Sequence, residues 1–517
     1  MRIVRITNCT TATPLRKWPR LRLWRKKCSG IPRFFKQKTV NLKVEKIEMK
    51  KVSIILLRGD DSLSGCRRFT EEEAGYVARK AASDADYCVL PFPEYRIAVF
   101  YPIKETQKSQ RWEKVRRTAS DILHLLQKEK LYEAEVLDED WADTASVEAF
   151  VESLHLSSYS FSEFKTEKKP AFSFHVVSEY MEEGRLRLTE RLCAEVNRAK
   201  YLVDLPFSAL NAAQLAEWAQ KGASELGLEV KVWSEEALAS SGMGGLLGVN
   251  KGSVDKPSFT EIEYRPAAPK NKKPVVLVGK GVVFDAGGMN IKTGNYMEDM
   301  KTDMAGAALV IGIMRSLAVL GLPLYVKGLV PATDNRLNGN ALVCGDVIRM
   351  YDGTTVEITN TDAEGRLLLA DAVAYAQKNL DPALIVTMAT LTGAASRALG
   401  SEGIAAMQEE ADAYVPLLQQ AGEDTHERLC FFPMWKEYEK ELESGVADLK
   451  NCGNGAAGMI TAAKFIRRFT TAPFVHLDVA GVEYLHRRDA YRGPGATAFG
   501  LRLMTEFFRM LAQQEMK

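Results

Sequence analysis

From about residue 50 to residue 180, short apolar segments typical of buried strands alternate with longer segments that have the apolar periodicity of helices. The expected strands are 52–57, 96–101, 131–137, 160–164 and 171–177, and the expected helices are 70–82, 107–130 and 145–154. Strands that alternate with helices in this way predict an α/β layer structure with a mostly parallel sheet.

A second series of the same kind follows a helical stretch, Glu183–Leu202, which we expect to link two domains. Its expected strands are 275–278, 324–330, 356–359 and 384–388, and its expected helices are 303–318 and 367–377. A chain of 517 residues exceeds the size of one ordinary core. We predict a basic N-terminal extension (1–48), an N-terminal α/β domain (49–182), a linker helix (183–204) and a catalytic α/β domain with a mixed central sheet flanked by helices (205–517).

Charge is distributed unevenly along the chain. Residues 1–44 carry 13 of the 69 basic residues and no acidic residue, which leaves 56 basic and 67 acidic residues, a net charge of −11, for the remainder. The acidic remainder has no general nucleic-acid signature. The basic head resembles an organelle presequence and lacks the apolar core of a secretory signal. A disordered basic tail, or sequence upstream of a start at Met49, are the alternatives. We expect a cytoplasmic or mitochondrial protein that is not secreted.

Two patterns argue against a membrane-spanning protein and against a disulfide-stabilised one. No apolar run reaches the roughly 20 residues of a membrane span, and the longest candidate, Ala305–Leu322, contains Arg315 and predicts a buried helix. The eight cysteines form no CxxC pair, which argues against a disulfide framework and against a thiolate zinc site. We expect Cys344 and Cys452 to be small buried side chains.

Histidine is scarce in the part of the chain where we expect the functional site. The chain has six histidines, and none lies between residues 176 and 425. HExxH zinc chemistry and a local histidine-based triad are therefore disfavoured in that interval. A site there must be built from carboxylates, lysines and arginines. We interpret His476, in an apolar strand, as a core histidine with its hydrogen bonds satisfied.

Two clusters meet this requirement. The strand 275–278 runs into Gly279-Lys280-Gly281, with Asp285, Lys292 and Asp303 downstream. The carboxyl end of a strand is where open α/β sheets bind ligands. In the second cluster, residues 359–367, an extended backbone places Asp362 and Glu364 on one side, where they repel each other unless a cation lies between them. A helix cap would explain Asp362, but it would not also explain Glu364 and Arg366.

Together the clusters contain enough ligands for two divalent ions. Four carboxylates supply hard oxygen ligands and a neutral lysine amine adds one nitrogen: Asp285, Asp303, Asp362, Glu364 and Lys280. Two metals about 3.5–4 Å apart can make a water molecule nucleophilic near neutral pH. Two cationic side chains, Lys292 and Arg366, remain as partners for an oxyanion or a bound anion.

These clusters resemble a known family. Gly279–Gly288 with Lys292, Met300–Asp303 and the octapeptide Asn360–Leu367 are similar to the leucyl aminopeptidase family of dinuclear-zinc cytosol aminopeptidases, of which the octapeptide is the signature. The resemblance covers roughly residues 195–510, whereas residues 50–180 match only in their α/β pattern. It implies a metal-dependent aminopeptidase that releases N-terminal residues, with leucine and other apolar residues preferred.

The resemblance also implies roles for single residues. Asp285 and Glu364 would bridge the two metals, Lys280 and Asp303 would complete the tighter site, and Asp362 would complete the exchangeable one. The ions would be Zn²⁺, with Mn²⁺ or Co²⁺ at the exchangeable site. They would activate a water, with Lys292 as the electrophile and a bicarbonate at Arg366 as the general base. The pocket for the first side chain would contain Met300, Asn360, Thr390, Leu391, Gly393 and Ala480.

Beyond the site, the resemblance implies a macro-like N-terminal α/β domain and a homohexamer, a dimer of trimers, that acts on peptides. Glu483 departs from the apolar residue expected beyond Ala480, which makes a strict leucine preference doubtful. The segment 494–500 also differs from the usual pattern, away from the expected ligands.

Other readings stay open at this point. Another two-metal hydrolase such as a phosphoesterase usually adds histidines, and a DNA-binding role would rest on the basic head. The glycine-rich segment Gly242–Gly248 lacks the spacing of a nucleotide-binding loop, and we expect a tight connection beside the site.

Overall fold

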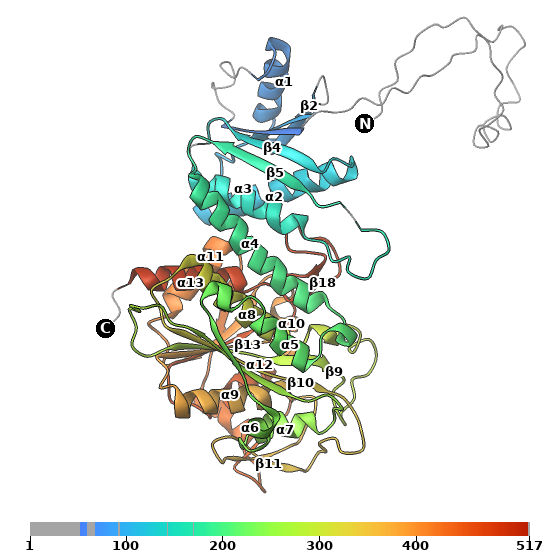
Figure 1. Cartoon of the computed structure of the whole chain (residues 1–517), viewed down its shortest axis with the longest axis vertical. Helices are drawn as coiled ribbons and strands as arrows, with labels where there is room; N and C mark the ends of the chain where they lie inside the picture. The colour runs from blue at the N-terminus through green and yellow to red at the C-terminus, as the bar shows by residue number, and fades with distance from the viewer. Residues whose placement is uncertain (1–51, 59–67, 91–93, 142, 169, 515–517) are drawn as a thin grey trace, which may run out of the picture.

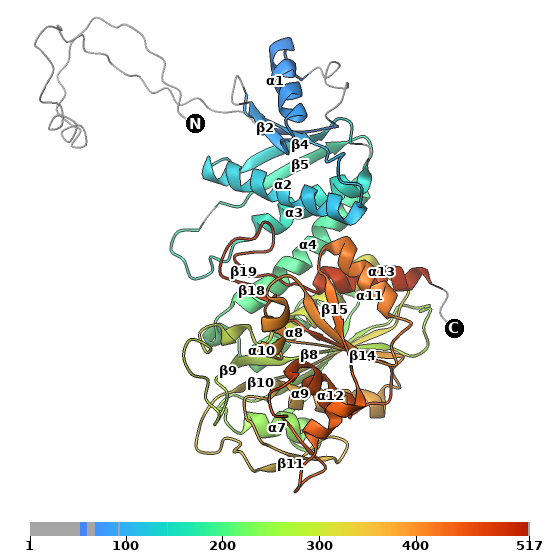
Figure 2. The same cartoon turned by 180° about the vertical axis from the view of Figure 1, so that it is seen from behind.

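Two large sheets with a long helix between them form most of the computed structural model of the chain, and the described residues also contain a three-stranded and a two-stranded sheet. It describes residues 52–58, 68–90, 94–141, 143–168 and 170–514. Helix α4 (Glu183–Asp204) runs between the N-terminal sheet and the larger C-terminal sheet in both views (Figures 1 and 2). The long linking helix expected at 183–202 is therefore present. The predicted basic extension and the alternative start at Met49 lie outside the described residues.

The N-terminal sheet has five strands in the order β2-β3-β1-β4-β5. Their bounds are β1 Val52–Leu57, β2 Tyr87–Leu90, β3 Arg96–Phe100, β4 Glu133–Asp138 and β5 Ser173–Ser178. β1 pairs in parallel with β3 and with β4, β5 is parallel to β4, and β2 adds an antiparallel edge. The predicted, mostly parallel arrangement is thus observed.

Side-chain alternation along β1 explains why helices cover both faces of this sheet. Ile54 and Leu56 belong to one core cluster, which includes residues of α2 (Lys108–Lys128) and α3 (Thr144–Ser158). Ile55 and Leu57 belong to a second cluster with α1 (Glu71–Ala82). Successive strand residues point to opposite faces, so an uninterrupted apolar strand requires cover on both sides.

The strand predicted at 160–164 is wrong. This segment is part of the connection between α3 and β5, because the place beside β4 is taken by residues 173–178. Its apolar character serves a different contact: the ring of Phe161 packs on Tyr201 of α4, with ring centroids 5.8 Å apart. Next to it, the hydroxyl of Tyr159 donates to Asp204 Oδ2 at 2.7 Å.

The C-terminal sheet is mixed and has nine strands, in the order β15-β14-β17-β13-β8-β10-β7-β6, with β9 paired to β10. The bounds are β6 Glu229–Val232, β7 Ser258–Tyr264, β8 Val275–Gly279, β9 Gly281–Asp285, β10 Val326–Asn335, β13 Leu384–Ala389, β14 Ile404–Glu409, β15 Leu429–Phe432 and β17 Phe474–Asp478. The four central strands β17, β13, β8 and β10 are parallel, so their carboxyl ends meet at one edge.

Helices cover both faces of this sheet as well. One face packs against α4, α8 (Ala305–Leu320), α11 (Val415–Thr425) and α13 (Leu501–Gln513). The other packs against α7 (Gly244–Asn250), α9 (Gly365–Asn379) and α12 (Gly458–Arg467). Within the described ranges, one segment, Met300–Leu320, has the length and composition of a membrane span, and 89% of its apolar window is buried inside the protein. Its burial agrees with the predicted core helix.

A buried ion cluster joins the two parts of the chain. Glu152 of α3 accepts hydrogen bonds from Arg502 Nε of α13 at 2.7 Å and from Arg116 Nε of α2 at 2.8 Å. Burial alone would raise the pKa of Glu152, but the two guanidinium groups outweigh it and lower the pKa from 4.5 to about 2. The cluster therefore stabilises the fold at every pH at which the carboxylate is ionised in the unfolded chain.

We expect Glu152→Gln to lower the free energy of unfolding at pH 7 by about 3 kcal/mol, because it removes the carboxylate that two buried guanidinium groups share. Each arginine then keeps only a longer ion pair, Arg502 with Glu427 at 3.6 Å and Arg116 with Glu113 at 3.9 Å. Since the folded pKa is depressed, this contribution is complete above pH 4.5 and disappears as the pH falls toward 2. Denaturant unfolding at several pH values measures it. Glu183→Gln, which breaks an exposed ion pair with Arg187, is the control and should have little effect. An equal cost at pH 7 and pH 2 would contradict the assignment.

Candidate metal centre

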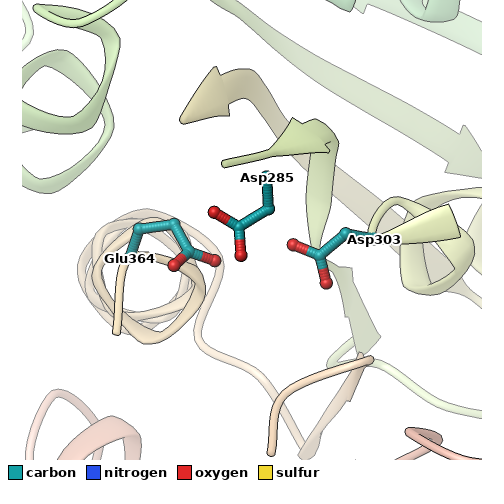
Figure 3. A group of neighbouring side chains, drawn as sticks. All are labelled: Asp285, Asp303 and Glu364. Carbon is teal, nitrogen blue, oxygen red and sulfur yellow. The ribbon is translucent and has the colours of Figure 1, made fainter. Parts of the chain in front are cut away.

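Three buried carboxylates come together at the carboxyl edge of the C-terminal sheet. Asp285 is the last residue of β9, Asp303 precedes α8, and Glu364 immediately precedes α9. One ligand oxygen from each lies within 4.8 Å of the other two (Figure 3). The side chains come from three different elements and point toward one another, so the site depends on the tertiary fold.

Lys280 binds two of these carboxylates. Its ammonium nitrogen lies 2.8 Å from Asp303 Oδ2 and 3.0 Å from Glu364 Oε1, and it donates to the carbonyl oxygen of Thr390 at 3.0 Å. The lysine reaches Glu364 by passing the first turn of α9. A Cβ at Gly365 would lie 2.5 Å from Lys280 Cε, so a larger residue here would displace the lysine side chain from its present position.

Lys292 joins the third carboxylate to Asp362. Its ammonium nitrogen lies 2.7 Å from Asp285 Oδ2 and 2.7 Å from Asp362 Oδ1. The loop that carries Lys292 turns at Gly287, where φ is +89° and a Cβ would meet Asp362 Oδ1 at 2.8 Å. Asp362 does not cap α9, since the N-cap residue is Glu364 and no side chain caps the helix. Asp362 therefore lies next to the group of three carboxylates but is not a member of it.

The charges of this cluster do not balance. Four carboxyl groups face two lysine ammonium groups within the contacts described above. Burial, with the charge of Glu364, raises the pKa of Asp285 to about 6 although Lys292 and Lys280 act in the opposite sense. Burial also raises the pKa of Asp303 and of Asp362. The pKa of Glu364 alone is lowered, because Lys280 and Lys292 outweigh its burial.

Divalent ions would supply the missing positive charge. Asp303 Oδ2 and Asp362 Oδ1 accept no hydrogen bond of good geometry, although each lies close to a lysine. Buried carboxylates with free lone pairs are the oxygen ligands that hard cations select. The three carboxylate side chains Asp285, Asp303 and Glu364 therefore fit a metal centre. In the absence of such ions the same carboxylates raise the pKa of Lys280 despite its burial. Its predicted role as a neutral ligand thus requires that metals take up their charge.

An asparagine that the sequence reasoning missed holds the cluster together. Asn335 ends β10 and stands opposite Asp285 in the register of β9 and β10. Its amide nitrogen lies 2.8 Å from Asp285 Oδ1 and 3.4 Å from Glu364 Oε2. The sequence did contain a signal for Asn335, because residues 333–335 are polar and stand at the end of a buried strand. Only the pairing of β9 with β10 shows what that run contacts.

Asn451 and Asp478, two further residues that the sequence analysis did not single out, each make a specific set of contacts near the site. Asn451 Nδ2 donates to Asn360 O at 2.7 Å, and its backbone carbonyl accepts from Arg366 Nη1 at 3.0 Å. Asp478, 1% exposed, accepts from the backbone N–H groups of Leu391 at 3.0 Å and Ala480 at 3.2 Å. The two side chains hold the loops that flank the carboxylates.

Arg366 is buried, and its Nε makes no hydrogen bond within the described part of the chain. His476 lies in β17 near this arginine, and burial together with Arg366 lowers its pKa to about 3. Its Nδ1 lies 2.7 Å from the hydroxyl of Thr387, whereas Nε2 has no hydrogen-bond partner among the described residues. His476 is thus a neutral core histidine as predicted, but its hydrogen bonding is only half satisfied.

The predicted pocket residues fall into two groups. Thr390, Leu391 and Ala480 form the first group. The hydroxyl of Thr390 donates to Asp303 Oδ1 at 2.8 Å, and the backbone N–H groups of Leu391 and Ala480 both donate to Asp478. The side chains of the other three form no hydrogen bond with the carboxylates of Asp285, Asp303 and Glu364 in the described structure. Met300 begins a 3-10 turn before Asp303, Gly393 begins α10 (Gly393–Leu399), and Asn360 Oδ1 accepts from the backbone of Asp362 at 2.9 Å.

Two smaller expectations need correction. Cys344 is exposed and Cys452 is half-buried, so neither is a small buried side chain. The Cys344 thiol donates to Asn290 Oδ1 at 3.1 Å because its loop lies against the loop of Lys292. The glycine-rich segment forms the first turns of α7, which packs on α9. A Cβ at Gly245 would lie 2.5 Å from Leu367 O, so this segment provides close helix packing and no loop for a ligand.

Fold and site together define an α/β metal-binding enzyme. Residues 197–505 match the cytosol aminopeptidase family, catalytic domain. A probable cytosol aminopeptidase of Geobacter sp. (strain M21) is 42% identical over 363 residues, which are 68% of this chain and 73% of that protein. The chain belongs to the cytosol aminopeptidase family, and it is accordingly a metal-dependent hydrolase that removes N-terminal residues from peptides.

Solved structures agree in fold over most of the chain. The bottromycin maturation enzyme BotP, in complex with Mn, superposes with a TM-score of 0.78 at 28% identity, covering 90% of this chain and 100% of BotP. The cytosol aminopeptidase from Coxiella burnetii superposes with a TM-score of 0.75 at 27% identity, covering 91% and 99%. The resemblance predicted from the motifs is therefore confirmed.

Proposed function

We propose that two divalent ions bind in this centre, held by Lys280, Asp285, Asp303, Asp362 and Glu364, and that they serve the removal of N-terminal residues from peptides. The observation that supports this most directly is the group of three buried carboxylates within 4.8 Å, flanked by two lysines. We expect Zn²⁺, with Mn²⁺ or Co²⁺ at the exchangeable position next to Asp362. The Mn complex of BotP, a protein of the same fold, is compatible with Mn²⁺.

Such ions supply Lewis acidity, which polarises a carbonyl group and lowers the pKa of water. The protein's own contribution starts with Lys292. The charges of Asp285, Glu364 and Asp362 outweigh its burial and raise its pKa, so the ammonium group stays protonated. It lies between Asp285 and Asp362, where it can donate a hydrogen bond to the oxygen of the scissile carbonyl as negative charge develops there.

Arg366 has a different role in this proposal. Burial lowers its pKa, but a guanidinium remains charged at any working pH. Its Nε donor is free of protein partners in the described structure, while Nη1 is held by Asn451 O. A buried cation with a free donor favours a small planar anion, and we propose bicarbonate, which would accept a proton as the general base.

Assembly, domain limits and location are part of the same proposal. We propose a homohexamer, a dimer of trimers, with domain limits at 49–182, 183–204 and 205–517. The names of the relatives place those proteins in the cytosol, and we propose the same compartment for this one. The mitochondrial alternative and any DNA-binding role would rest on residues 1–44, which lie outside the described ranges.

Hydrolysis of leucyl-4-nitroanilide tests the proposed function. We expect cleavage by the purified protein, loss of cleavage after chelation, and recovery with Zn²⁺, Mn²⁺ or Co²⁺. The N-acetylated substrate is the matched control, because an aminopeptidase requires the free amino group. Equal cleavage of the acetylated compound, or full activity in chelator with no bound metal by elemental analysis, would refute the proposal.

A further inference from the structure

A cavity of about 190 Å³ lies between helices that cover the N-terminal sheet and helices that cover the C-terminal sheet. Its walls come from α2 and α3 on one side, from α8, α11 and α13 on the other, and from α4 between them. Ser316 belongs to this wall, and a helical rise of about 1.5 Å per residue puts it about 16 Å along α8 from Ala305, which follows Asp303 closely. None of the lining residues is a proposed metal ligand, so the cavity is separate from the metal centre.

Charges of both signs line this cavity in equal number. Four arginines and four acidic residues contribute to its wall, so the formal charge of the wall is balanced. Several of these groups pair with one another, as in the cluster around Glu152. Two of them, Arg116 and Glu506, keep a capacity for binding that the described residues do not use.

Arg116 supplies an unused donor. The residue is 6% exposed, its Nε donates to Glu152 Oε2 at 2.8 Å, and its Nη2 donates to the carbonyl oxygen of Asp424 at 3.1 Å. Nη1 forms no hydrogen bond with any described residue, and its ion pair with Glu113 at 3.9 Å is too long for one. A buried guanidinium donor without an acceptor is costly, and the carboxylate of a ligand would satisfy it.

Glu506 has the opposite requirement. Its one ion pair within the described ranges is with Arg509 Nη1 at 3.3 Å, and the side chain of that arginine is 42% exposed. Burial raises the pKa of Glu506, and three other carboxylates of the same wall add to this effect although Arg509 acts in the opposite sense. An ammonium group of a ligand would stabilise the ionised form of Glu506.

The uncharged part of the wall is mostly apolar, with Trp112, Leu192 and Leu501 as its largest members. These side chains provide a surface for an aliphatic group. An apolar cavity of about 150 Å³ holds benzene, which has six carbon atoms, so a cavity of about 190 Å³ suits a molecule somewhat larger than that. Arg185 is exposed and Arg509 is half-buried, so the cavity is accessible from solvent on their side.

We infer that this cavity binds a free α-amino acid with an aliphatic side chain of about the size of leucine. The carboxylate of the amino acid would accept from Arg116, its ammonium group would pair with Glu506, and its side chain would pack on the apolar wall. A zwitterion provides both charges and leaves the balance of the wall unchanged. The proposed reaction releases such amino acids, so the cavity would bind a product away from the metal centre. Because the walls come from helices of both sheets, binding would stabilise their packing.

Hydrogen exchange measured by mass spectrometry on the metal-loaded, full-length protein tests the inference. We expect L-leucine to slow amide exchange in α3 and α13, and its concentration dependence there gives the dissociation constant of this site alone. Leucine bound at the metal centre would instead protect residues 280–303 and 360–367, so the two sites are distinguished.

Two truncated compounds test the chemical class of the ligand. The compound 4-methylpentanoate is leucine without its amino group, and 3-methylbutylamine is leucine without its carboxylate. Each should bind in the cavity at least about 10-fold more weakly than leucine, as for one lost charged hydrogen bond. Protection of α3 and α13 by either compound with the affinity of leucine would overturn the assignment of an amino acid.

Two variants test the location. Ala149→Leu fills part of the cavity and keeps every charged group, so leucine should no longer protect α13. Arg116→Lys keeps a cation beside Glu152 but removes Nη1, and it should raise the dissociation constant about 10-fold. Ala194→Leu, at an exposed position of α4, is the matched control and should keep the wild-type constant. Unchanged affinity in Ala149→Leu, or no protection of α3 and α13 in the wild-type protein at millimolar leucine, would overturn the inference and leave the proposed aminopeptidase function untouched.

Discussion

Glu364→Gln should abolish high-affinity metal binding and reduce hydrolysis by more than the roughly 10²–10³-fold that follows the loss of a single positioned donor. Glu364 is proposed to bridge both ions, and its oxygens lie within 4.8 Å of ligand oxygens of Asp285 and Asp303. Removing a bridge also leaves two dications less screened from each other. Elemental analysis after dialysis should find zero to one ion per chain, as the two-metal proposal requires.

Two further variants make this result specific. Asp303→Asn should retain about one ion, because Asp303 is proposed to contact a single metal. Asp371→Asn is the matched control: Asp371 is a fully buried carboxyl group on the same helix α9, but it accepts hydrogen bonds from the backbone N–H groups of Leu246 and Tyr351. It should lower stability while metal content stays at about two. Two tightly held ions in Glu364→Gln would exclude the bridging role.

Lys292→Met should leave about two ions bound and lower kcat by roughly 10²–10³-fold, the effect of losing one donor to a developing oxyanion. Methionine keeps most of the length of the side chain and removes the charge. In the structure Lys292 lies 2.7 Å from both Asp285 Oδ2 and Asp362 Oδ1, so the variant also changes the charge balance among the carboxylates. The measurement is therefore kcat together with metal content.

The outcome of that pair of measurements is decisive. A loss of rate with metal retained supports oxyanion stabilisation by Lys292. A loss of metal in parallel with rate would make Lys292 a structural partner of Asp285 and Asp362, and the role would have to be reassigned. Lys273→Met, which breaks an exposed ion pair with Asp381 in the same proposed domain, should change neither quantity.

Much of the site follows from local sequence. The five expected metal ligands lie near strand ends and helix starts, and Lys292 lies in the loop that follows β9. Glycines and polar residues interrupt apolar segments at these places, and that pattern is readable without a structure. The prediction from sequence was limited by contacts between residues that are far apart in the chain. Asn335 could not be predicted because its partner Asp285 lies 50 residues away, and the two meet only when β10 pairs with β9. The false strand at 160–164 has the same cause, because a strand needs a free neighbour as well as an apolar pattern.

The sequence by itself determined the α/β class, the long linking helix, the family and the carboxylate-rich chemistry of the site. These depend on side-chain periodicity and on short motifs, which are local properties. The tertiary structure decided which oxygens converge and how two lysines share four carboxylates. Charge balance and burial are sums over residues distant in the chain, so only the folded arrangement gives them their values.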